Sequence, residues 1–256
     1  YDAASRTSTT YSPVGRPRLA TTDLLGRVTQ AKIGNLLPVS TSYDSHGRLS
    51  TITQGSGAET RTQSLDYNAD GYLSSLTDAL GRTLSFQYDA KGNLISITPP
   101  GRPAHAFVYT PVDLQAQYVP PTVAGVTDPR TLYSYNLDKQ LTRIDRPDGQ
   151  SLFFAYDAAG RLDTLTLLNG VVGYGYDPTT GKLIQIDDPD GGSLAFTFAG
   201  SLLTQSAWTG DVVGSVGRIY DNDFRITALD VNGADAINFQ YDNDSLLIQA
   251  GTLALI

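Results

Sequence analysis

Three clusters of aspartate are the residues that could do chemistry in this 256-residue chain. They are Asp187-Asp188-Pro189-Asp190, Asp221-Asn222-Asp223 and Asp242-Asn243-Asp244. Calcium takes oxygen ligands, so each cluster is a conceivable calcium site. Neither the EF-hand spacing nor the RTX nonapeptide pattern occurs, and turns select Asp and Asn for their own reasons. We therefore favour turn chemistry at all three clusters and assign no metal site.

Other reactive side chains are few, because the chain has no Cys, two His and a single Glu. His46 lies inside a turn and is expected to be solvated, and His105 is expected in a loop before an apolar strand. Without Cys, a thiol nucleophile is excluded, and a transition-metal site is not expected. Glu59 stands in a Gly/Ser-rich loop with no carboxylate partner that the sequence identifies. No P-loop or Gly-x-Ser-x-Gly elbow occurs, so we predict no catalytic residue, no cofactor and no enzyme activity.

The overall charge and composition exclude further classes. With 26 acidic and 18 basic residues the formal net charge is -8, which argues against nucleic acid as a partner. No apolar run approaches the roughly 18 residues that a membrane-spanning helix needs. The chain begins Tyr1-Asp2 and stops at Ile256 in the middle of a repeat. We interpret it as a piece of a longer polypeptide that continues beyond both ends.

The acids are 25 Asp and one Glu, and the bases are 14 Arg and four Lys. Asp favours turns, whereas Glu and Lys favour helices, so this balance indicates strands joined by many tight turns.

An internal repeat is the strongest signal in the sequence. Aromatic residues followed by turn residues recur at intervals of 20 to 26 residues. They are Tyr43, Tyr67, Tyr88, Tyr109, Tyr135, Tyr156, Tyr176, Phe198, Tyr220 and Tyr241. The flanks repeat too, since Tyr43-Asp44-Ser45-His46-Gly47-Arg48-Leu49 matches Tyr156-Asp157-Ala158-Ala159-Gly160-Arg161-Leu162. We predict structural roles for Tyr43, Asp44, Gly47, Tyr67, Gly71, Tyr88, Asp89, Gly92, Tyr156, Asp157, Gly160, Tyr176, Asp177, Tyr220, Asp221, Tyr241 and Asp242.

Each repeat reads as a β-hairpin of about 21 residues. Apolar residues alternate before the turn, as in Leu152, Phe154 and Tyr156, which places them on one face of a strand. The Asp can bond nearby backbone N–H groups, and the Gly can take a positive φ. A second turn, such as Pro147-Asp148-Gly149, leads to the next hairpin.

The repeats predict an all-β fold of tandem antiparallel hairpins that form a long curved or spiralling sheet. Residues 1–42 look like a degenerate start, and 43–256 hold about ten repeats, with irregular units at 109–134 and 198–219. We expect the inward aromatic series to form a real core. An alternative architecture is a propeller, since two repeats match the length of one four-stranded blade. A cut ribbon would expose edges, so we expect the isolated chain to self-associate unless its edges are capped.

The phrase Tyr-Asp-x-x-Gly-Arg-Leu at this period resembles the RHS or YD-repeat family, which includes the shells of bacterial polymorphic toxins and the YD repeats of teneurins. The resemblance is good over residues 43–256 and weak over 1–42. It implies a β-ribbon that spirals into a hollow shell, around a C-terminal toxin in bacterial members. Bacterial shells typically close with an Asp-Pro-x-Gly cleavage motif. None of the three Asp-Pro pairs of this chain matches it, so no cleavage residue is assigned.

The resemblance implies a structural role for the chain. We expect a shell segment of a large exported bacterial protein that encapsulates or presents a C-terminal toxin or effector domain. The implied partners are the neighbouring repeats and that enclosed domain, and the implied location is secreted or at the cell surface. The alternative is an extracellular adhesion module that binds glycan or a cell-surface protein.

Overall fold

The computed structural model describes residues 1–55, 57–122 and 124–255. Among the described residues the regular elements are β-strands and one 3-10 helix, η1 (Gly57–Glu59). The prediction of an all-β chain of antiparallel hairpins is therefore confirmed. The chain divides into two compact units, unit 1 over Tyr1–Arg130 and unit 2 over Thr131–Ile256. The longest connection between described strands, which includes the three prolines Pro120, Pro121 and Pro129, precedes unit 2.

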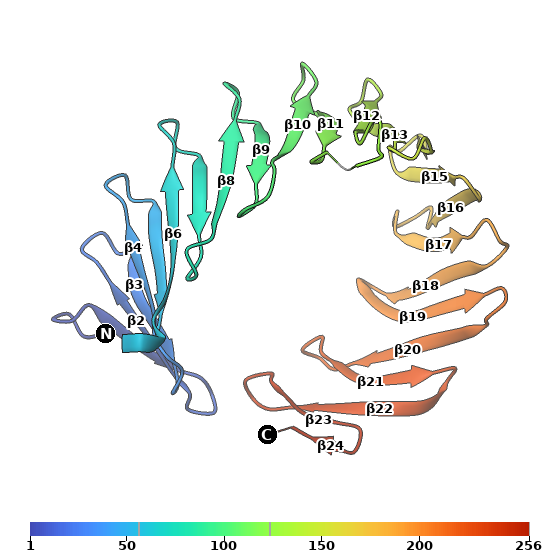
Figure 1. Cartoon of the computed structure of the whole chain (residues 1–256). Helices are drawn as coiled ribbons and strands as arrows, with labels where there is room; N and C mark the ends of the chain where they lie inside the picture. Colours follow the sequence, from blue (N-terminus) through green and yellow to red (C-terminus); the bar gives the residue numbers. More distant parts are fainter. Residues whose placement is uncertain (56, 123, 256) are drawn as a thin grey trace. The chain divides into compact units, whose positions relative to one another are not determined.

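Unit 1 contains eleven strands among its described residues, coloured blue to green in Figure 1. They are β1 (Thr7–Tyr11), β2 (Pro17–Thr22), β3 (Val28–Ile33), β4 (Val39–Tyr43), β5 (Leu49–Gln54), β6 (Arg61–Tyr67), β7 (Leu73–Thr77), β8 (Thr83–Tyr88), β9 (Leu94–Thr98), β10 (His105–Tyr109) and β11 (Gln115–Val119).

Unit 2 contains thirteen strands among its described residues. They are β12 (Thr131–Tyr135), β13 (Leu141–Asp145), β14 (Ser151–Tyr156), β15 (Leu162–Leu167), β16 (Gly170–Tyr176), β17 (Leu183–Asp187), β18 (Ser193–Ala199), β19 (Leu202–Thr209), β20 (Gly214–Tyr220), β21 (Ile226–Val231), β22 (Ala234–Tyr241), β23 (Leu247–Ala250) and β24 (Leu253–Ala254).

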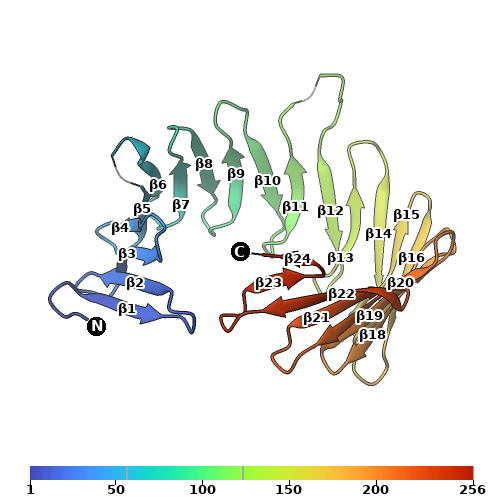
Figure 2. The ribbon, with the colours of Figure 1, turned by 90° about the horizontal axis from the view of Figure 1, so that it is seen from below.

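Within each unit, every strand pairs antiparallel with the strand that follows it in the chain. The pairing is continuous from β1 to β11 in unit 1 and from β12 to β24 in unit 2. Figure 2 shows the same succession from below. The propeller alternative is wrong, because separate four-stranded blades would interrupt this hydrogen bonding.

Two kinds of turn alternate along the ribbon. Each even-numbered strand from β4 to β22 ends at or next to the repeat aromatic residue and leads through a turn into the next strand. We call the turns after even-numbered strands Tyr–Asp turns, although Asn68, Thr110, Asn136 and Ala199 stand at the Asp position in four of them. In each of these hairpins the register shifts by one residue just before the aromatic, as between Ser42 and Tyr43. Such a β-bulge bends the strand and increases its twist. Repeated once per hairpin, it accounts for the steady bend of the unit 2 ribbon from β12 to β22 (Figure 1).

The expectation of a real hydrophobic core is wrong. Among the described residues only Gly217 and Ala228 are buried, Ala228 at 7% exposure, and no large side chain is fully buried. Apolar residues do alternate on one face, as with half-buried Leu152 and Phe154, but contacts between strands join only successive neighbours. Each unit is therefore a single-layer sheet, and no second layer of described residues closes over the apolar face.

His105 is also placed differently from the prediction. It is the first residue of β10 rather than part of a loop, and its Nδ1 lies 2.6 Å from the hydroxyl oxygen of Tyr118 on β11. The two rings are nearly parallel, with centroids 5.8 Å apart. His46, by contrast, is exposed in its turn.

Candidate functional site: the stacked Tyr–Asp turns

The carboxylate of the aspartate organises each Tyr–Asp turn that contains one. In the turn between β4 and β5, Asp44 Oδ1 accepts the backbone N–H groups of His46 and Arg48, each at 2.9 Å. Gly47 completes the turn with a φ of +82°, a conformation that L side chains rarely adopt. One carboxylate oxygen thus satisfies two turn N–H groups, which explains why Asp recurs at this position.

The second carboxylate oxygen binds the arginine that ends the turn. Arg48 Nε donates to Asp44 Oδ2 at 2.7 Å, and a terminal guanidinium nitrogen lies 2.7 Å from the same oxygen. The same pair forms in four more turns, namely Asp23–Arg27, Asp78–Arg82, Asp157–Arg161 and Asp221–Arg225. Charge-assisted bonds of this kind are stronger than neutral ones and fix the direction of the arginine side chain.

Four of these arginines reach the next repeat. The guanidinium carbon of Arg48 lies 4.4 Å from the centre of the Tyr67 ring, and Arg27 and Arg161 cover Tyr43 and Tyr176 at the same distance. Such positions are favourable because the ring face is electron-rich. The fourth, at the far end of unit 2, covers its ring at 5.0 Å.

The repeat tyrosine returns a bond to the preceding hairpin. Tyr67 donates its hydroxyl to the carbonyl oxygen of Leu49 at 2.8 Å, which ties β6 to the start of β5. Six other repeat tyrosines make the equivalent bond at 2.8 Å: Tyr43, Tyr109, Tyr156, Tyr176, Tyr220 and Tyr241. The repeat tyrosine is therefore a hydrogen-bonded link between neighbouring hairpins.

The glycine of the next turn also contacts the arginine. A Cβ added at Gly47 would lie 3.1 Å from Arg27, and one at Gly71 would lie 3.4 Å from Arg48. We call the arrangement a turn clasp: the Asp and Arg of one turn, with the Tyr and the glycine-position residue of the next. Complete turn clasps with glycine begin at Asp23, Asp44 and Asp157.

Other repeats vary the turn clasp. In place of arginine, Tyr72 stacks on Tyr88 with ring centroids 4.9 Å apart, and Gly92 leaves room for the Tyr72 hydroxyl. Lys182 lies 4.9 Å from the centre of the Phe198 ring. Gln140 donates to the carbonyl of Gly160 at 2.9 Å. The link between successive turns is thus kept while its chemistry changes.

A row of ion pairs lowers the pKa values of the turn carboxyls. The pKa of Asp157 lies below its ordinary value because the backbone N–H and then the guanidinium of Arg161 bind the carboxylate. The pKa of Asp44 is lowered by the backbone and side chain of Arg48, although burial opposes the shift as the largest single effect. These carboxylates are ion-paired and hydrogen-bonded within their own turns.

The structure places the predicted Tyr, Asp and Gly residues at equivalent positions of the Tyr–Asp turns. All the predicted aspartates accept backbone N–H groups of their own turns; at Asp177 these come from Thr179 and Thr180, and at Asp242 from Asp244 and Leu246. Asp223 lies 3.3 Å from the Arg225 guanidinium, as an ion pair inside its turn. Within the described ranges, no three His, Asp or Glu side chains form a group that could hold a metal ion.

Sequence reasoning missed the arginines. The Arg of the Gly-Arg-Leu phrase was visible in the repeat, but its aromatic partner lies in the following hairpin. It also missed Thr22-Asp23-Leu24-Leu25-Gly26-Arg27 as a Tyr–Asp turn, because threonine stands in the tyrosine position.

No helix in the described part of the chain could span a bilayer.

Comparisons with known proteins agree with this arrangement. The family model described as Teneurin YD-shell matches residues 1–256. A crystal structure of TcdB2-TccC3 without its hypervariable C-terminal region has a TM-score of 0.69 at 14% identity, over 98% of this chain and 16% of that one. Another TcdB2-TccC3 crystal structure gives 0.58 at 13% identity, over 96% and 20%. A Tc holotoxin pore of Photorhabdus luminescens gives 0.56 at 12% identity, over 92% and 16%. At these identities the likeness shows the fold alone, and this chain spans a fifth or less of each solved chain.

Proposed function

The chain belongs to the teneurin YD-shell family, and from that premise we propose that it forms part of the wall of a protein shell enclosing another segment of its parent polypeptide. The enclosed segment is a C-terminal toxin or effector domain, and the parent is an exported bacterial protein. The wall is structural, and we assign it no catalytic step.

The observation that carries the proposal is the uncovered apolar face. Among the described residues only Gly217 and Ala228 are buried, although apolar and aromatic side chains alternate along one face of the strands. Folded chains of this length normally cover such a face with a second layer. A face left accessible over many strands is suited to line a compartment and to contact what the compartment holds.

The turn clasps suit a wall for a second reason. A single-layer sheet cannot rely on a packed core, so neighbouring hairpins need direct links in addition to their backbone bonds. Each turn clasp supplies an ion pair inside one turn, together with a cation–ring contact and a tyrosine hydroxyl bond between successive hairpins. Continuous strand pairing within each unit also leaves no free edge between hairpins, which limits unwanted association.

The solved structures of similar fold support the choice of a C-terminal cargo. One of them is described as TcdB2-TccC3 without its hypervariable C-terminal region, so that protein has a variable segment at its C-terminal end. The alternative of a glycan-binding or cell-adhesion module gains no support from the family match or from the solved structures.

The proposal is tested by limited proteolysis of the full-length parent polypeptide. Its C-terminal region, expressed alone, provides the reference digestion rate. We expect the same region to be digested much more slowly inside the native parent, and to lose this protection in urea concentrations that unfold the ribbon. Equal digestion rates in the native parent and in isolation would overturn the proposal.

A further inference from the structure

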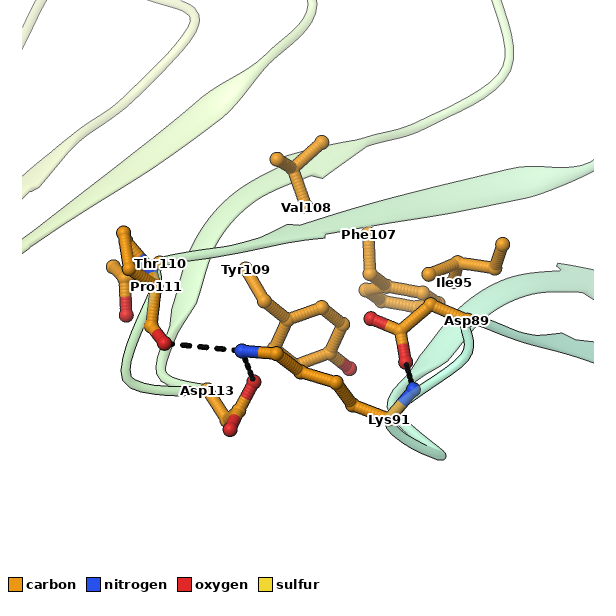
Figure 3. A pocket seen from close by; sticks show the side chains of 9 residues that line it. All are labelled: Asp89, Lys91, Ile95, Phe107, Val108, Tyr109, Thr110, Pro111 and Asp113. Carbon is orange, nitrogen blue, oxygen red and sulfur yellow. Dashed lines mark hydrogen bonds and ion pairs between the residues drawn. The ribbon is translucent and has the colours of Figure 1, made fainter.

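A hollow beside the Tyr–Asp turns of β8–β9 and β10–β11 lies where other repeats place an arginine. It has a volume of about 430 Å³, and its lining includes Asp89, Tyr109 and Asp113 (Figure 3). These residues are the turn Asp, the next repeat Tyr and the next glycine-position residue of a turn clasp. At the arginine position stands Asn93, whose side chain is too short to reach over the ring.

The polar groups of the turn clasp are present here without its guanidinium. Asn93 Nδ2 donates to Asp89 Oδ2 and to Asp113 Oδ1, each at 3.0 Å, and its bond to Asp89 matches the bond that arginine Nε makes to the turn Asp in the clasps. No cation–ring contact among the described residues involves Tyr109. The Tyr109 hydroxyl still bonds to Leu94 at 2.8 Å, which holds the ring in the orientation of the other clasps.

The charge of the hollow favours a cation. Asp89 and Asp113 contribute two negative charges, and Lys91, which lies 2.9 Å from Asp113 Oδ1 and donates to the Pro111 carbonyl, contributes one positive charge. The remaining charge is one negative. Burial first, and then the nearby Asp89 carboxylate, raise the pKa of Tyr109. In the complete clasps the arginine neutralises the turn carboxylate, so one added cation would restore that balance.

We propose that this hollow binds the guanidinium group of an arginine side chain from another polypeptide segment. The group would lie over the Tyr109 ring and bond to Asp113 and Asp89, as Arg48 does with Tyr67 and Asp44 within the chain. A planar guanidinium fits both an aromatic face and a carboxylate, whereas a lysine ammonium is a compact, strongly hydrated charge. The site is exposed, with Asp113 47% accessible, so the interaction is weak for a single residue and gains strength within a longer ligand.

The test uses the whole 256-residue chain with 13C-labelled tyrosine, and the Tyr109 signal is assigned with Tyr109→Phe. The probe is N-acetyl-arginine amide, compared with the neutral N-acetyl-citrulline amide of nearly equal shape. We expect a saturable shift of the Tyr109 signal with a dissociation constant of about 1 to 100 mM, and at least about fivefold weaker binding of the citrulline probe. An equal response to both probes, or no saturable shift, would overturn the proposal.

Two variants locate the site. Asn93→Arg should abolish probe binding, because the chain's own guanidinium would then cover Tyr109. Asp113→Asn should weaken binding by about fivefold, while Asp70→Asn, at an exposed turn position outside the hollow, should leave it unchanged. If Asn93→Arg does not fold, the Asp113→Asn and Asp70→Asn pair decides. Equal affinity in those two variants would contradict the assignment.

Discussion

The guanidinium of Arg48 lies 4.4 Å from the centre of the Tyr67 ring while the same side chain is held at 2.7 Å by Asp44. One arginine therefore belongs to two hairpins at once. Because only Gly217 and Ala228 are buried among the described residues, links of this kind carry a share of stability that a hydrophobic core would otherwise provide. Several measurable consequences depend on that link.

Removing the arginine of a turn clasp should weaken the ribbon. We expect Arg48→Ala to lower the free energy of unfolding by about 1–2 kcal/mol, because it removes a cation–ring contact and the partner of a carboxylate. Urea denaturation followed by circular dichroism measures the change. Arg102→Ala is the control, since none of the described contacts involves its exposed side chain, and it should change stability by less than about 0.5 kcal/mol.

The tyrosine hydroxyl should be worth one hydrogen bond. Tyr67→Phe removes the 2.8 Å bond to Leu49 and should cost about 0.5–1.5 kcal/mol of unfolding free energy. Phe198 already occupies a repeat position in which the hydroxyl is missing. The reverse change, Phe198→Tyr, should therefore raise the free energy of unfolding by a comparable amount. Unchanged denaturation midpoints in both variants would show that the hydroxyl link is dispensable.

Glycine should stabilise the turns that lack it. Phe224 occupies the glycine position of its turn with a φ of +63°, and its side chain is 71% exposed. Phe224→Gly should raise the free energy of unfolding by about 1 kcal/mol, since it relieves backbone strain and gives up little burial. We expect the same gain in stability from Lys139→Gly, because Lys139 also has a positive φ, +64°. Gly160→Ala should lower the free energy of unfolding. A loss of stability in Phe224→Gly or in Lys139→Gly would contradict the explanation.

The turn carboxylates predict a loss of stability in acid. The pKa of Asp157 lies below its ordinary value, chiefly because the Arg161 backbone N–H binds it, and the Arg130 side chain lowers the pKa of Asp128 to about 2. A carboxyl with a lowered pKa in the folded state stabilises the fold above its unfolded value of about 3.9. That contribution is lost as pH falls through the folded value. Urea midpoints should thus be nearly constant from pH 7 to 5 and fall toward pH 2, with a smaller fall for Asp157→Asn.

Much of the architecture follows from residue spacing, since the repeated aromatic and the Asp-x-x-Gly phrase predict hairpins of one length. The β-bulge before Tyr43 could not be predicted, because it depends on the pairing between strands rather than on either strand alone. The partner of Arg48 could not be predicted either, because Tyr67 comes close only after the hairpins pair. The alternation at Leu152 and Phe154 correctly predicted which face of the strand is apolar and less exposed. It contains no information about what covers that face.

The most direct test of the turn clasp is a double-mutant cycle between Arg48 and Tyr67. The single variants Arg48→Ala and Tyr67→Leu and the double variant are compared by urea denaturation. Because the two side chains touch, their effects should differ from additivity by about 0.5–1 kcal/mol. A cycle between Arg48 and Tyr88, which share no described contact, should be additive within about 0.3 kcal/mol. Additivity between Arg48 and Tyr67 would contradict the claim that the Tyr–Asp turns join one hairpin to the next.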